Sequence, residues 1–152
     1  VAEEVVNPGF LSSGYELPCW VCVGDRDPAA GTDVDGQLEV MLAANRWMGS
    51  SEEGDAVCGE ACSEEGPVRP TRFPPDEIRT GENYYTASRG YLQGDRFRTF
   101  VYHGLDGLPR VAFTVMKNMP HGAIREQSRA AWEFLRHFRR PEGSRQVEYL
   151  PD

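Results

Sequence analysis

Two polar residues, Asp27 and His121, each follow an apolar segment with the composition of a buried strand. In open α/β sheets ligands bind beyond the carboxyl ends of the strands, so an acid and a histidine on two such loops can meet there. A histidine that acts as a general base needs a carboxylate on its other ring nitrogen to hold one tautomer. The order of acid before histidine therefore predicts an acid–histidine pair, with a carboxylate oxygen about 2.6–3.2 Å from a ring nitrogen. Each residue also has an ordinary explanation, because Asp27 can cap a turn and His121 can be a loop residue.

The four cysteines form two pairs, Cys19/Cys22 and Cys58/Cys62, which is the ligand number of a zinc site. Cys19 and Cys22 lie in an apolar run, and residues three apart on a strand point to opposite faces. This pattern favours buried core thiols over zinc ligands. A disulfide between Cys58 and Cys62, redox chemistry and a zinc-stabilised domain are the alternatives.

The remaining polar residues give weaker indications. Four aspartates between residues 25 and 35 invite a calcium loop, but Ala30 and Gly36 stand where an EF-hand requires glycine and glutamate. These aspartates are Asp25, Asp27, Asp33 and Asp35. We expect His103 at a partly exposed strand end and His137 late in a helix, next to its C-terminal dipole.

The first half of the chain contains one strand and one helix that can position Asp27. Residues 17–23 predict a strand buried on both faces, which ends at a polar turn containing Pro28. Residues 35–48 predict a helix that Asp33 or Asp35 caps and Gly49 closes. Its apolar stripe is Leu38, Met41, Leu42 and Met48.

The second half predicts a hairpin and a helix around His121. Residues 96–102 and 110–116 alternate as strands, joined by a turn at residues 104–107. Residues 125–140 predict an amphipathic helix that ends before Pro141. Its apolar stripe is Ala131, Phe134, Leu135 and Phe138, widened by Trp132.

Between these halves lies a segment of different composition. Residues 50–66 contain six acids and no base, within an acidic and Pro-rich insertion at about residues 50–75. This composition predicts a solvated loop followed by an extended connector. Residues 76–92 are ambiguous, with a short helix expected at residues 83–88.

Length and charge exclude several classes of protein. The chain has 152 residues and a net charge of −8, which suits one globular domain and gives no basic field for nucleic acid. No stretch approaches 18 consecutive apolar residues, so no membrane span is expected. The chain starts at Val1 without a leader, which is typical of an interior cut or a processed end and leaves cytoplasmic and secreted locations both open.

Three segments resemble the C-terminal part of an α/β-hydrolase, in the branch of polyhydroxybutyrate depolymerase-like and feruloyl-esterase-like serine esterases. They are residues 17–28, residues 91–102 with the returning strand, and residues 118–140. In that family the acid follows a strand as Gly-x-x-Asp, which places this role on Asp27, and the histidine lies in a Pro-His motif, which places it on His121. The resemblance implies that residues 1–152 are the last strands and hairpin of a hydrolase sheet, with flanking helices.

One part of the family pattern is missing from this sequence. The nucleophile of the family is the serine of Gly-x-Ser-x-Gly, which precedes the acid, whereas the nearest match here, around Ser88, follows it. The resemblance therefore implies that the serine and the oxyanion hole lie in an N-terminal part absent from this chain, and that the isolated chain is inactive. It implies no cofactor and no metal.

The resemblance also implies the partners of the chain. These are a small-molecule or polymeric ester, such as a hydroxyalkanoate or hydroxycinnamate ester, and either the N-terminal half of the hydrolase or a homo-oligomer. The residues that could line part of the substrate pocket, although core packing explains each as well, are Trp20, Tyr84, Tyr85 and Tyr91. The alternative is a non-catalytic α/β module that binds or assembles through an exposed sheet edge.

Overall fold

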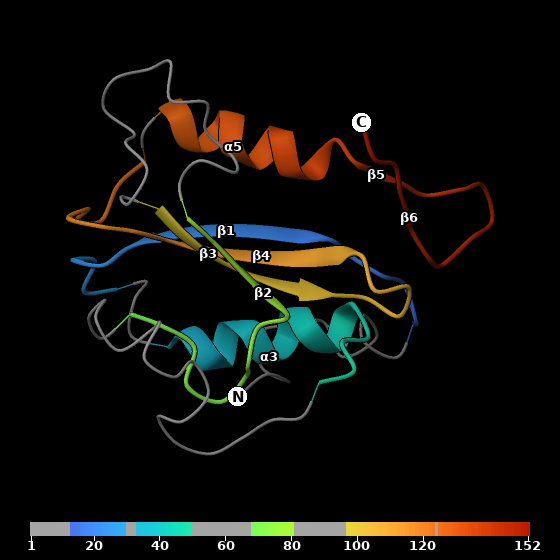
Figure 1. The fold of residues 1–152 in the computed structure, drawn as a ribbon, viewed down its shortest axis with the longest axis horizontal. Helices are drawn as coiled ribbons and strands as arrows, with labels where there is room; N and C mark the ends of the chain where they lie inside the picture. The colour runs from blue at the N-terminus through green and yellow to red at the C-terminus, as the bar shows by residue number, and fades with distance from the viewer. Residues whose placement is uncertain (1–12, 30–32, 50–67, 81–96, 124) are drawn as a thin grey trace.

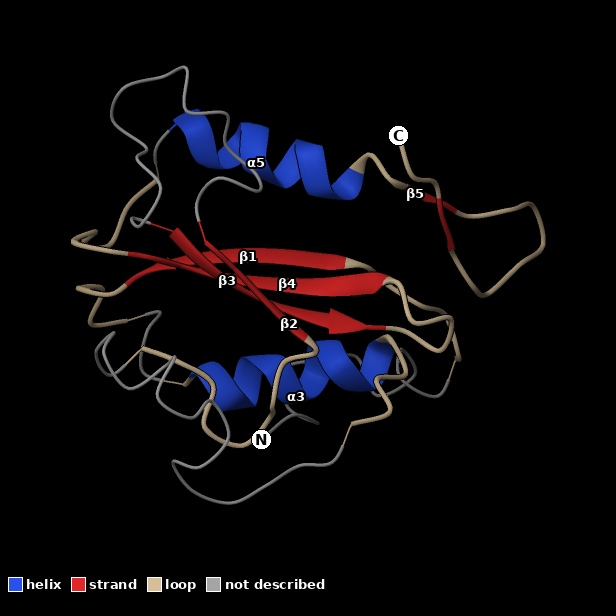
Figure 2. Cartoon of the chain, in the orientation of Figure 1, coloured by secondary structure: helices blue, strands red, loops and turns tan. Residues whose placement is uncertain are grey.

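The computed structural model of the protein describes residues 13–29, 33–49, 68–80, 97–123 and 125–152. A sheet of four strands lies between two helices, α3 on one face and α5 on the other (Figures 1 and 2). The expected α/β class is therefore confirmed. Among the described residues no helix is long and apolar enough to span a membrane.

The sheet has mixed topology, with strand order β1-β4-β3-β2. β1 (Cys19–Gly24) runs parallel to β4 (Pro109–Met116), and β4 pairs antiparallel with β3 (Phe97–His103). β2 (Glu77–Thr80) adds an antiparallel strand beyond β3. The expected hairpin is confirmed. β2 was not expected, and the helix predicted at residues 83–88 lies outside the described residues.

The first strand differs from the prediction in its start and its burial. It begins at Cys19, not at Leu17, because Pro18 has no N–H to donate and the carbonyl of Leu17 accepts from Asn45 Nδ2 at 2.7 Å. Most of its residues are half-buried, since β1 is an edge strand of the described sheet. Cys19 packs toward α3 and Cys22 toward α5, so their expected placement on opposite faces is confirmed.

The helix α3 (Val34–Ala44) begins as expected, with Asp33 Oδ1 accepting from Gly36 N at 2.9 Å. The predicted end near residue 48 is wrong. Asn45 is buried and its side chain also donates to Met41 O, and Arg46 then adopts a left-handed conformation with φ 55°. The apolar stripe therefore stops before Met48, which is 78% exposed.

The last helix is also shorter than predicted, because α5 (Arg125–Leu135) stops before Phe138. Phe138 instead opens β5 (Phe138–Arg139), which pairs with β6 (Glu148–Tyr149), and its ring contacts Tyr149 edge-on. His137 is consequently not a helical residue. Its Nδ1 lies 2.8 Å from Leu150 O and its ring stacks on Tyr149.

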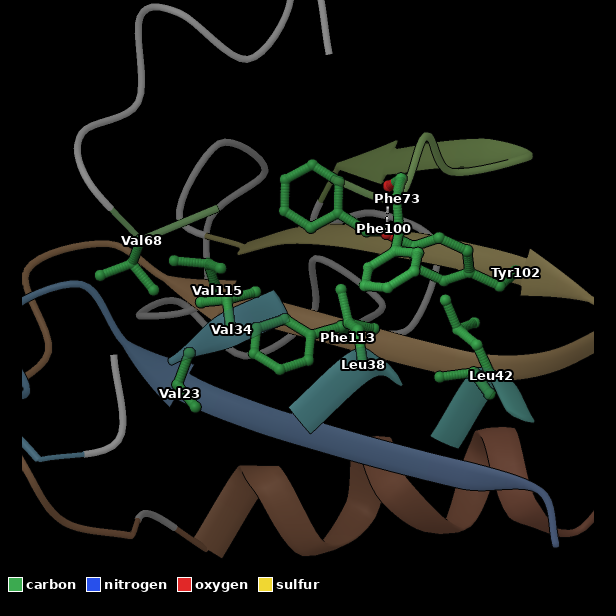
Figure 3. Close-up of a cluster of buried hydrophobic side chains, with 11 residues drawn as sticks. Val23, Val34, Leu38, Leu42, Val68, Phe73, Phe100, Tyr102, Phe113 and Val115 are labelled. Carbon is green, nitrogen blue, oxygen red and sulfur yellow. Dashed lines mark hydrogen bonds between the residues drawn. The ribbon is translucent and has the colours of Figure 1, made fainter. Parts of the chain in front are cut away.

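The larger apolar core lies between the sheet and α3 (Figure 3). Val111, Phe113 and Val115 share this face of β4, as the alternation predicted. The segment expected as a connector enters the same core, because Val68 and Phe73 are buried there and Phe73 O accepts from Tyr102 Oη at 2.9 Å. The acidic residues 50–66 lie outside the described residues, so the solvated loop stays a prediction.

The isolated chain is expected not to behave as a clean monomer. β1 is apolar, but in the described sheet only its β4 side is paired, and an unpaired apolar edge strand is a template for pairing with another chain. Size-exclusion chromatography with light scattering should therefore show an oligomer or aggregate, unless an additional chain segment pairs with β1. A cooperative 17.0 kDa monomer would contradict both this prediction and the half-domain interpretation.

Candidate functional site

Asp27 and His121 lie on neighbouring loops because of the register between β1 and β4. Gly24 pairs with Met116, so these parallel strands end at the same level of the sheet. The chain reaches Asp27 three residues after the end of β1, and it reaches His121 five residues after the end of β4. Two side chains 94 residues apart in sequence therefore meet at one edge of the sheet.

The contact expected between the two residues is confirmed, with Asp27 Oδ2 2.8 Å from His121 Nδ1. The other carboxylate oxygen, Oδ1, accepts from Ala29 N at 2.8 Å, and Asp27 N donates to Gly24 O at 3.2 Å. Only 6% of the Asp27 side chain is accessible. Asp27 thus both closes its own turn and presents one fixed oxygen to the imidazole.

The imidazole is placed very differently from its partner, since 74% of the His121 side chain is accessible. A carboxylate can only accept, so the neutral ring that donates to it carries its proton on Nδ1. Nε2 then has a lone pair and can take a proton from another group. This arrangement has the geometry of a histidine base oriented by an acid.

The loop that carries His121 approaches the acid loop too closely for any side chain at Gly24. A Cβ on this residue would lie 2.0 Å from Met119 O, which is inside van der Waals contact. Arg26 N donates to that same carbonyl at 3.0 Å. Asn118, with φ 58°, turns the chain back after β4 and makes the approach possible. The role of Gly24 was missed in the sequence, although the glycine of Gly-x-x-Asp at a strand end is a signal for it.

The other predicted candidates are not brought to this site. His103 ends β3, at the far end of the hairpin strand, with Nε2 3.8 Å from Glu77 Oε2. A hydrogen bond from Arg79 lowers the pKa of Glu77. Trp20 packs with Cys22 toward α5, and its Nε1 has no hydrogen-bond partner among the described residues. Several candidates lie outside the described residues: Ser88, Tyr84, Tyr85, Tyr91, Cys58 and Cys62.

The aspartates that invited a calcium loop are used in other ways. Asp33 caps α3, and Asp35 accepts from the hydroxyl and the N–H of Thr71. Asp25 Oδ1 accepts from Met119 N. In the part of the chain that the structure describes, no three His, Cys, Asp or Glu side chains gather as metal ligands would.

Fold and site together define an α/β protein with an acid–histidine pair beyond the carboxyl ends of two parallel strands. No family model matches the chain, and no similar protein was found among curated proteins or among solved structures. The chemistry of the pair and its position in the sheet are therefore the basis on which we discuss function.

Replacing Gly24 by Ala should separate the two loops. The added Cβ must displace the backbone of Met119, which is expected to destabilise the fold by about 1–3 kcal/mol and to break the Asp27–His121 bond. Denaturant unfolding and ¹⁵N NMR of histidine-labelled protein measure the two effects. Gly143→Ala is the control, because it strains the backbone (φ 73°) but meets no atom within 4 Å. Unchanged His121 signals in Gly24→Ala would refute the steric argument.

The thiols of Cys19 and Cys22 should be unreactive in the folded chain. Burial raises the pKa of each thiol to about 11, against an ordinary value of about 9. At pH 8 the thiolate fraction is then on the order of 10⁻³, so alkylation by iodoacetamide should be roughly 100-fold slower than in urea and should accelerate as the pH rises. Peptide mapping by mass spectrometry measures both rates. Equal rates in folded and unfolded protein would contradict the assigned burial.

Proposed function

We propose that this chain supplies the acid and the histidine of a Ser–His–Asp triad in a carboxylic ester hydrolase. The observation that carries the proposal is the 2.8 Å contact between buried Asp27 and exposed His121, at the carboxyl ends of parallel strands. The resemblance to polyhydroxybutyrate depolymerase-like and feruloyl-esterase-like enzymes gives the same roles to the same two residues. In this proposal the chain is the C-terminal portion of the hydrolase domain.

In the proposed reaction His121 moves the protons and Asp27 orients it. Nε2 takes the proton of a serine hydroxyl as the serine oxygen attacks the ester carbonyl, and Asp27 stabilises the imidazolium that forms. Nε2 then returns the proton to the leaving alcohol, and a water attacks the acyl-serine with the same histidine as base. The serine and the oxyanion hole come from a segment outside these 152 residues.

The proposed substrates are hydroxyalkanoate or hydroxycinnamate esters, small or polymeric. This substrate class follows from the resemblance alone. The accessibility of the His121 ring is compatible with it, since a bulky or polymeric ester needs an open approach to the base.

A second candidate function is a non-catalytic assembly module. The observation in its favour is the edge position of β1, whose outer side is unpaired within the described sheet. The two functions differ in what they require of His121. An assembly module would pair through β1 in the same way whether or not this imidazole were present.

The proposal predicts how triad variants affect ester hydrolysis. In protein that contains this chain together with its serine-bearing segment, His121→Ala and Asp27→Asn should each lower kcat on 4-nitrophenyl butyrate on the order of 10⁴-fold with little change in KM. His103→Ala and His137→Ala are matched controls, because both imidazoles lie away from the site. Retained turnover in His121→Ala would refute the proposal.

The chain by itself gives a second test. Its 152 residues contain no Gly-x-Ser-x-Gly, so it should hydrolyse the ester only at the background rate and should not be labelled by a fluorophosphonate. Strong turnover that Ser88→Ala abolishes would show that the nucleophile lies within this sequence.

A further inference from the structure

Met119 lies between the end of β4 and His121, and both of its backbone polar groups are bonded to the acid loop. Its carbonyl accepts from Arg26 N at 3.0 Å, and its N–H donates to Asp25 Oδ1 at 3.3 Å. Its side chain is buried in a cluster with Met116 and with Ala130 of α5. Met119 is therefore the fixed point from which the chain continues to His121.

Asp25 contributes to this point with a side chain whose role differs from that of Asp27. Its carboxylate bonds the backbone of Met119, while its own N–H donates to Met116 O at 3.0 Å. Asp25 thus holds both ends of the turn that follows β4. A charged acceptor strengthens its bond to an N–H, and a buried N–H that loses its acceptor is costly. Met119 is only 8% exposed, so water cannot readily replace the carboxylate unless the loop moves.

We infer that Asp25 is a positioning residue for His121. The carboxylate of Asp25 fixes the backbone of Met119, so that the imidazole of His121 is held in contact with Asp27. The consequence for ester hydrolysis rests on the proposed function, whereas the consequence for the geometry does not. Misplacement of a reacting group by about 1 Å can lower a rate on the order of 10²-fold, so Asp25 can affect kcat without contacting the ester.

The tautomer of His121 provides a readout that a merely structural role would not change. In wild-type protein with a neutral imidazole, ¹⁵N NMR should show Nδ1 protonated, because Asp27 accepts from it. Asp25→Ala should shift this signal toward the tautomer mixture of free histidine. Asp25→Asn keeps an oxygen acceptor for Met119 N and should restore the wild-type signal. Asp27→Ala marks the full loss of the acceptor for Nδ1.

The matched control is Asp106→Ala at the β3–β4 turn. Asp106 Oδ1 accepts from Leu108 N at 3.0 Å and Oδ2 accepts from Arg110 Nη2 at 2.7 Å, so the substitution removes the same kind of carboxylate-to-backbone bond, together with an ion pair, at the other end of β4. It should leave the His121 signals unchanged. A wild-type tautomer in Asp25→Ala, or a loss in Asp25→Asn equal to that in Asp25→Ala, would overturn the inference.

If Asp25→Ala does not fold, hydrogen exchange in the wild-type chain decides the matter. The Met119 amide should exchange at least tenfold more slowly than that of exposed Ala123, and equal rates would overturn the inference. Neither measurement needs an ester. Loss of the Nδ1–H signal in Asp25→Ala together with full activity in His121→Ala would support the positioning role and refute the hydrolase. A wild-type Nδ1–H signal in Asp25→Ala together with lost activity in His121→Ala would refute the positioning role and support the hydrolase.

Discussion

The close approach of two backbones at Gly24 is the constraint on which the candidate site depends. With no side chain there, the carbonyl of Met119 can lie against the end of β1 and accept from the acid loop. The parallel register brings the two strands to the same level, and this contact then brings their loops together. Asp27 and His121 are therefore positioned by backbone geometry before their own side chains contribute.

The pair could be predicted from the sequence because its signals are local. An apolar run that ends in Gly-x-x-Asp and another that leads to Pro-His mark two strand ends, and strand ends meet at one edge of a sheet. The central strand β4 could also be predicted from the sequence. The structure buries all of its residues. Its alternation and the turn chemistry before it leave few other structures open.

The element ends that were missed depend on contacts distant in sequence. Asn45 ends α3 with a side chain whose other partner is Leu17 O, and Phe138 leaves the helical pattern to contact Tyr149. β2 is held through Asp76, which accepts from His103 N at 2.7 Å and from Trp47 Nε1 at 3.0 Å. Such partners are brought near only by the folded chain, so a window of sequence cannot reveal them.

Because Asp27 is buried and the ring of His121 is exposed, the two side chains interact at the boundary between the protein and water. Bulk water around an imidazole screens its attraction to a carboxylate, whereas removal of that water lets the same 2.8 Å contact act through a much lower effective dielectric constant. A surface that excluded water from the His121 ring would therefore strengthen the electrostatic attraction between the two side chains without altering either residue. Closing the water-facing side of the imidazole would also remove the hydration of the imidazolium, which opposes this gain in attraction.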